Sequence, residues 1–220
     1  MLKFQGCEFS AAGADQGAKV FGLTLKGAED VLIENCVFNG TGYSAILNQT
    51  AGDVTIKNSQ FECGNMRNPI EGGQTNHQGS LTVEDCNFEG VPGNNFINFY
   101  NVADNSVHII KNCKFAGGYD NNIIRLSNIN NLSATFNIEN VSYKFVEGEE
   151  AEWSGFLICQ DYTNRTGNKQ NFNKYRVNIV NLTRPAEGKL FYVYDDGEGI
   201  ISTNDPYVYL DGALVSNPVE

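Results

Sequence analysis

The chain has 220 residues, of which 41% are hydrophobic and 19% charged, so it can bury a core and does not belong to the disordered class. Its 15 basic and 26 acidic residues give a net charge of −11. We therefore expect neither nucleic acid nor a membrane surface as a partner, because both attract basic proteins. No apolar run approaches the roughly 18 residues that span a bilayer, and the residues after Met1 do not resemble an export signal.

One short pattern recurs along the chain: an apolar-x-apolar run, then Asn or Asp, then Cys-x-Phe. A half copy at 4–9 is followed in order by copies at 31–40, 54–61, 81–90, 109–115, 136–143 and 177–182. The Asn or Asp of the pattern marks a bend, and the residues at this position are Gly6, Asn35, Asn58, Asp85, Asn112, Asn140 and Asn181. Successive bend residues are separated by 29, 23, 27, 27, 28 and 41 positions. Periods of this length are typical of proteins built from stacked repeats.

Each copy has a simple physical interpretation. Alternating apolar residues indicate a short strand with one buried face, and Asn or Asp suits a bend because both tolerate left-handed backbone. A second set of apolar strands lies between the copies, at 44–47, 96–99, 123–126, 156–159 and 190–193. The sequence therefore predicts an all-β, right-handed parallel β-helix, a solenoid of about seven coils with three parallel sheets. A β-sandwich or barrel would also show alternating strands, but it would not require the same motif to recur at the same position of every repeat.

The ends of the repeat differ from its middle. The pattern fades after Val180, so we expect a single domain over 1–220 with a looser closing region at about 183–220. The segment 207–212 is expected to close the C-terminal end. The first coil begins almost at Met1, with no amphipathic helix over it, which suggests an end that docks on another molecule.

Four cysteines share one phase of the repeat: Cys7, Cys36, Cys86 and Cys113. Stacking predicts an internal ladder of reduced thiols that pack as small hydrophobes, which favours assembly in a reducing cytoplasm. No Cys/His spacing typical of a zinc site is present, and we expect no metal and no cofactor.

Three polar residues receive structural interpretations. Asn140 and Asn181 begin N-x-S/T sequons but fall on the repeated bend, where we expect them to be buried. His108 alternates with apolar neighbours and is expected at the surface of a strand.

The repeated V-x-I-x-N-C-x-F-x-G pattern resembles the pectin-lyase-like superfamily of right-handed parallel β-helices over about residues 4–195. That superfamily includes polysaccharide lyases, polygalacturonase-type hydrolases, bacterial surface adhesins, and bacteriophage spike, fibre and virion proteins. The resemblance implies a fold and leaves the function open, because one scaffold serves many activities.

The candidate catalytic residues are Asp161, Asp195 and Asp196. Asp195-Asp196 resembles the paired aspartates of hydrolase members, and Asp161 and Asp195 each follow a strand of the second set, so stacking can bring them together. Hydrolysis of a glycosidic bond needs two carboxylates roughly 5 to 10 Å apart. The other hydrolase and lyase motifs are missing, so the sequence favours no enzyme activity. Trp153 and Tyr162 lie in longer insertions of the late coils and are the candidate binding residues for a sugar or a protein.

The resemblance and the missing enzyme motifs together suggest a virion structural protein. A compact acidic solenoid with reduced thiols resembles a capsid decoration protein, head fibre or tail-associated spike of a bacteriophage or virus. We expect a non-catalytic assembly or display module, assembled in the host cytoplasm, that binds other capsid or tail proteins and can form homo-oligomers. Two alternatives stay open: a carbohydrate-binding or polysaccharide-degrading module, and a fragment of a bacterial surface adhesin.

Overall fold

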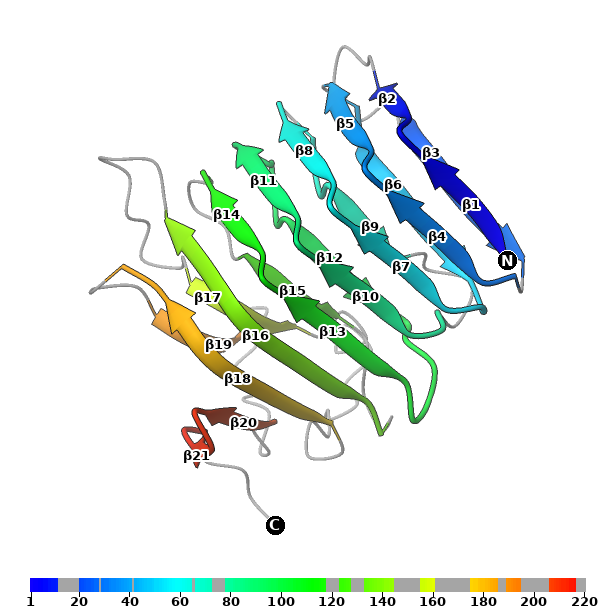
Figure 1. Ribbon diagram of the computed structural model, residues 1–220. Coiled ribbons are helices and arrows are strands. Elements are labelled where there is room, and N and C mark those ends of the chain that lie inside the picture. Colours follow the sequence, from blue (N-terminus) through cyan, green and yellow to red (C-terminus); the bar gives the residue numbers. More distant parts are fainter. Residues whose placement is uncertain are drawn as a thin grey trace.

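The computed structural model describes residues 1–11, 20–27, 29–40, 42–64, 66–72, 78–117, 123–127, 133–144, 155–160, 175–185, 189–194 and 206–216. Every helix or strand assigned within these residues is a β-strand, and no helix there is long and apolar enough to cross a membrane. The strands form a right-handed parallel β-solenoid, which confirms the predicted fold class. In Figure 1 the chain runs along the front of the molecule, returns behind it, and begins the next coil one strand further along.

Strands in equivalent positions of successive coils stack into three ladders. The first ladder contains β1 (Leu2–Gln5), β4 (Val31–Glu34), β7 (Val54–Lys57), β10 (Leu81–Glu84), β13 (Val107–Lys111), β16 (Thr135–Lys144), β18 (Arg176–Thr183) and β20 (Tyr207–Leu210). The second contains β2 (Glu8–Ala11), β5 (Val37–Gly40), β8 (Gln60–Cys63), β11 (Asn87–Gly90) and β14 (Lys114–Ala116), and it ends on β16. The third contains β3 (Phe21–Gly27), β6 (Ser44–Thr50), β9 (Ile70–Gly72), β12 (Ile97–Tyr100), β15 (Ile124–Ser127), β17 (Gly155–Gln160) and β19 (Lys189–Tyr194).

The number of complete coils is smaller than predicted. Five coils have three separate strands, from β1–β3 to β13–β15, against the seven or so expected. In the next two coils one long strand, β16 or β18, continues through the bend at Asn140 or Asn181, with backbone pairing on both sides of it. This continuity joins the first two ladders into one sheet of 14 strands beside a sheet of seven, so two sheets replace the predicted three.

The predicted bends have the expected backbone conformation. The φ angle is 63° at Gly6 and 50–54° at the six Asn or Asp positions, values that Gly, Asn and Asp adopt at the least cost. In the later coils the bend side chains bond to one another. Asn112 Nδ2 donates to Asp85 Oδ1 at 3.0 Å, and Asn181 Nδ2 donates to Asn140 Oδ1 at 2.8 Å. The prediction that Asn140 and Asn181 are buried is wrong: both are exposed, because a left-handed bend turns its side chain away from the core.

The interior beside these bends is filled by stacked side chains. Phe9, Phe38, Phe61, Phe88 and Phe115 stack with ring centroids 4.4–4.9 Å apart. The position directly after each bend residue, which holds most of the cysteines, forms a second inward row. In the second to sixth coils its residues are at most 1% exposed: Cys36, Ser59, Cys86, Cys113 and Val141. The described cysteines form no disulfide. The predicted internal ladder of cysteines is confirmed.

Cys86→Ser should change the free energy of unfolding by less than about 1 kcal/mol. The Cys86 thiol donates to the Glu84 carbonyl at 3.2 Å, and the Ser59 hydroxyl makes the same contact with the Lys57 carbonyl at 2.9 Å one coil earlier. A hydrogen bond with Cys113, together with burial, raises the pKa of the Cys86 thiol, so the sulfur carries its proton, as the serine hydroxyl does. Urea denaturation measures the change. Cys86→Leu is the control, because overpacking this slot should cost roughly 1–3 kcal/mol, and equal losses for both variants would contradict the ladder.

His108 lies inside the solenoid, and the prediction of a surface position is wrong. Its side chain is 1% exposed and its ring stacks on Phe136 at 4.9 Å, its register partner in the next coil. Nδ1 accepts a hydrogen bond from the Leu81 amide at 3.1 Å. Nε2 lies 2.9 Å from Ser106 Oγ, which donates to the Ala103 carbonyl at 2.6 Å, so the ring carries its proton on Nε2. Desolvation lowers the pKa of His108 to about 3, which keeps the ring neutral.

Candidate functional site

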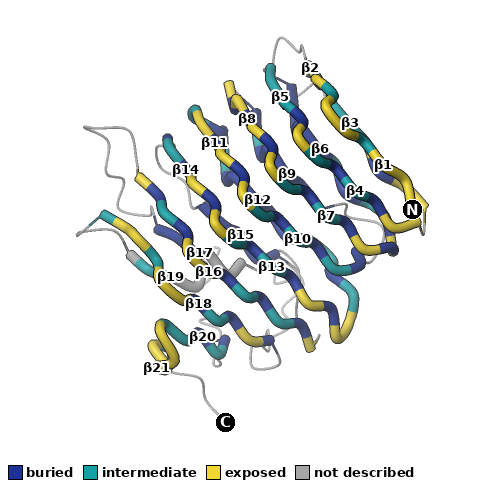
Figure 2. Tube along the Cα trace, viewed as in Figure 1, coloured by how far each residue is buried: buried dark blue, intermediate teal, exposed yellow. Residues whose placement is uncertain are grey.

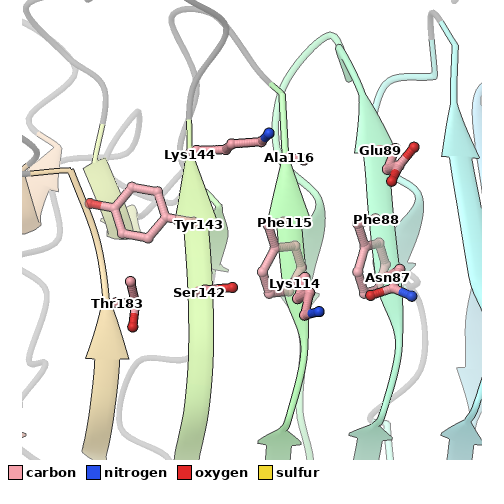
Figure 3. A pocket seen from close by; sticks show the side chains of 10 residues that line it. All are labelled: Asn87, Phe88, Glu89, Lys114, Phe115, Ala116, Ser142, Tyr143, Lys144 and Thr183. Atoms are coloured by element: carbon pink, nitrogen blue, oxygen red, sulfur yellow. The ribbon is translucent and has the colours of Figure 1, made fainter.

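A shallow trough of about 360 Å³ lies on the outer face of the second ladder, over β11, β14 and β16 (Figure 3). Two rows of outward-facing side chains border it, because alternate residues of a strand point to the same side, and the inward-facing Phe88, Phe115 and Tyr143 also line it. In strand register, one row is Asn87, Lys114, Ser142 and Thr183, and the other is Glu89, Ala116 and Lys144.

The trough is hollow because small side chains lie in its middle. Ala116 and Ser142 are half-buried, whereas the longer side chains around them, Lys114, Lys144 and Glu89, are exposed. Figure 3 shows Lys144 extending from β16 toward Ala116 on β14. Since β18 ends at Thr183, the last two residues of β16 have no register partner in the next coil, which opens the trough on that side.

The polar residues of the trough are mainly hydrogen-bond donors. Two ammonium groups, the hydroxyls of Ser142 and Thr183 and the amide of Asn87 can all donate hydrogen bonds. Glu89 is the one carboxylate among the lining residues, so the trough lacks the carboxylate pair of glycoside hydrolysis. Among the described residues no group of three or more His, Cys, Asp or Glu could hold a metal ion.

A second surface is the open first coil, formed by β1, β2 and β3. Its interior-facing residues Phe4, Cys7, Phe9 and Leu23 are only partly buried, whereas their counterparts one coil later are buried. Met1 is 78% and Leu2 49% exposed at its rim. A hollow of about 300 Å³ lies there, and Figure 2 shows the front of this coil as mostly exposed or intermediate.

The backbone of the open first coil also offers an edge. In the next three coils the amides of Val37, Gln60 and Asn87 each donate to a carbonyl of the preceding coil, at 2.9–3.1 Å. Glu8 is the register partner of Val37, and no preceding coil is present for it within the described residues. Such an edge is a template for another strand.

At the opposite end of the described solenoid, the first ladder alone is capped by a further strand. There β21 (Ala213–Leu214) returns antiparallel along β20, and the Val215 amide donates to the Val208 carbonyl at 2.9 Å. The third ladder ends on β19, whose outer edge has no strand partner among the described residues, so strand edges remain at both ends of the described solenoid.

The five site residues that the sequence suggests, Asp161, Asp195, Asp196, Trp153 and Tyr162, lie outside the described residues. The strands that precede two of them are described. β17 ends at Gln160 and β19 ends at Tyr194, and these two residues are register partners. The two strands therefore stack as the sequence predicts. That Asp161 and Asp195 lie close together stays a prediction.

Sequence reasoning missed the trough, although the repeat contains a signal for it. Lys114 and Ser142 each lie two residues after a bend residue, and Ala116 and Lys144 each lie four after one. Aligning the copies on their bends therefore places these four side chains in two adjacent outward rows.

No family model, no curated protein and no solved structure matches this chain. Its class is defined by its own geometry, that of a right-handed parallel β-solenoid. Its function is inferred from the two surfaces described above.

Proposed function

We propose that this protein is a non-catalytic structural component of a bacteriophage or viral particle, such as a capsid decoration protein, a head fibre or a tail-associated spike, assembled in the host cytoplasm. The observation that carries the proposal is the open first coil, whose interior-facing residues are only partly buried, whereas β21 covers the edge of β20 at the other end. A rod that docks through its first coil attaches in one orientation and leaves its long faces for display. The resemblance of the repeat to pectin-lyase-like β-helices, which include virion proteins, supports the same role.

The chemistry of the open first coil defines the partner. Phe4, Phe9 and Leu23 need apolar side chains over them, and the strand edges need backbone donors and acceptors. We infer that a neighbouring particle protein supplies an extended segment with alternate apolar residues, which pairs along β1 and β2 as each later coil pairs with the coil before it. This is strand addition, in which the backbone supplies affinity and alternate side chains supply specificity.

Lys3 allows a sharp test of this docking. The amides of Leu2 and Gly6 donate to carbonyls of the second coil at 2.7 and 3.0 Å, so the amide of Lys3 faces the free edge, because alternate residues of a strand bond to opposite sides. Lys3→Pro removes that outward donor and no hydrogen bond within the solenoid. Lys3→Ala is the matched control, since both variants lose the ion pair with Glu34.

We expect Lys3→Pro to be lost from purified particles and Lys3→Ala to be incorporated at the normal copy number, with both proteins folded. Cryo-electron microscopy of the particle then shows what lies on the open first coil. Equal incorporation, a free first coil, or a coil covered by the same polypeptide or by a second copy would contradict the proposal. Recovery only as a free protein would favour the carbohydrate-degrading alternative, which Asp161→Asn and Asp195→Asn test.

A further inference from the structure

Lysines on the outer face of the first ladder are paired with acids. One register row carries Glu34, Lys57, Glu84, Lys111 and Glu139, so the sign alternates from coil to coil. Lys57 Nζ lies 3.1 Å from Glu34, and Lys111 Nζ lies 3.6 Å from Glu139. On this face the strand register avoids placing like charges opposite each other, which would be destabilising.

The two lysines of the trough, Lys114 and Lys144, have no acid opposite them on the neighbouring strand of the β14–β16 pair. Lys114 and Lys144 lie on neighbouring strands and are offset by two residues, since Lys114 is opposite Ser142 and Ala116 is opposite Lys144. Diagonal neighbours of this kind are roughly 7 to 8 Å apart. Both lysines are exposed, and neither forms an ion pair within the described part of the chain. Two unpaired positive charges beside one hollow are unexpected in a protein with a net charge of −11.

We propose that the trough binds a tetrahedral oxyanion, phosphate or sulfate, either free or carried as an ester, with Lys114 and Lys144 supplying the charge. Lysine suits this ligand because its ammonium is a compact point charge with three donors. The Ser142 and Thr183 hydroxyls and the Asn87 amide add neutral donors along the same row. Two lysines against one Glu89 leave the lining with a net positive charge, opposite in sign to the whole protein.

The strands hold these donors in place before any ligand arrives. Asn87, Lys114, Ser142 and Thr183 come from four successive coils whose backbones pair in register. Sites built on strands are positioned more accurately than sites built on loops. The volume of about 360 Å³ lies within the range of small-molecule sites and leaves room for the remainder of an ester beyond the oxyanion.

Calorimetric titration of the full chain with inorganic phosphate, and separately with sulfate, tests the site. We expect saturable binding at low ionic strength, weakened on the order of tenfold by Lys114→Gln and by Lys144→Gln. Lys26→Gln is the matched control, because Lys26 is exposed, lies outside the trough and carries the same charge. Ser142→Ala should weaken binding less and leave its salt dependence unchanged, since it removes a donor and no charge. Circular dichroism checks that each variant is folded.

Two further titrations distinguish free from ester-borne oxyanion. Glycerol phosphate and a monosaccharide sulfate should bind more tightly than the inorganic ions if an ester is the ligand, and more weakly if the free ion is. Acetate, a single charge of different shape, should bind much more weakly than either. The proposal is overturned if neither phosphate nor sulfate saturates the protein, or if Lys26→Gln weakens binding as much as the two trough variants.

Discussion

Phe88→Ala is expected to lower the free energy of unfolding by roughly 3 to 5 kcal/mol. The Phe88 ring is fully buried between Phe61, at a centroid distance of 4.4 Å, and Phe115, at 4.7 Å, and it meets the edge of Phe96 at 6.0 Å. Removing the ring takes away its transfer free energy and leaves a cavity. The neighbouring coils cannot close that cavity easily, because their strands are tied in register to the strand that carries Phe88.

Phe9→Ala is the matched control for this prediction. Phe9 occupies the same row in the open first coil, where it stacks on Phe38 at 4.9 Å but is only partly buried. We expect a clearly smaller loss, because part of its apolar surface already contacts water. Urea denaturation of the two variants at neutral pH measures both values. Near-equal losses would contradict the assignment of Phe88 to a closed interior.

The repeat allowed the interior of the second ladder to be predicted from sequence. Once Asn58, Asp85 and Asn112 are recognised as bends, alternation places Phe61, Phe88 and Phe115 on one inward row and the cysteine phase on another. The left-handed φ at each bend and the stacked rings confirm both steps. The prediction succeeds because neighbouring coils repeat the same local chemistry at the same phase.

Where one coil departs from the others, the sequence was less informative. The third ladder was predicted at five of its seven strands; β3 was missed, and so was β9, a strand of only three residues with Glu71 at its centre. The merging of two ladders at β16 also escaped prediction, because Asn140 has the same residue type and the same φ as the bends that interrupt pairing elsewhere. Whether backbone pairing continues through such a bend depends on the neighbouring coil, which local sequence does not show.

His108 shows how alternation by itself can assign a residue to the wrong face of a strand. It lies four residues before its bend, as do Leu81 and Phe136, so phase alone indicates the interior. Its alternation with apolar neighbours was the basis of the predicted surface position instead. The interior tolerates the ring because the Leu81 amide and Ser106 Oγ satisfy both nitrogens, and because Phe99 and Phe136 pack against it.

The buried ring should make the protein lose stability in mild acid. The pKa of His108 is about 3 in the folded state, against about 6.5 in an unfolded chain. Between these values the unfolded chain takes up a proton that the native ring cannot accept. The stability associated with the neutral ring is therefore fully present above about pH 6.5, and it falls by roughly 1.4 kcal/mol for each pH unit below that.

His108→Asn separates this effect from the titration of carboxylates, which both proteins share. The Asn side-chain oxygen can accept from the Leu81 amide in place of Nδ1, so the variant keeps that contact but has no group that titrates. It should be less stable at neutral pH, because a smaller side chain leaves space beside Phe99 and Phe136. Urea denaturation at about pH 7.5 and about pH 5 should show the wild-type protein losing roughly 2 kcal/mol more than the variant over that interval. Equal losses of stability in the two proteins would mean that His108 accepts a proton in the folded state. The hydrogen bond from the Leu81 amide to Nδ1 opposes this, because a protonated Nδ1 has no lone pair to accept that hydrogen bond.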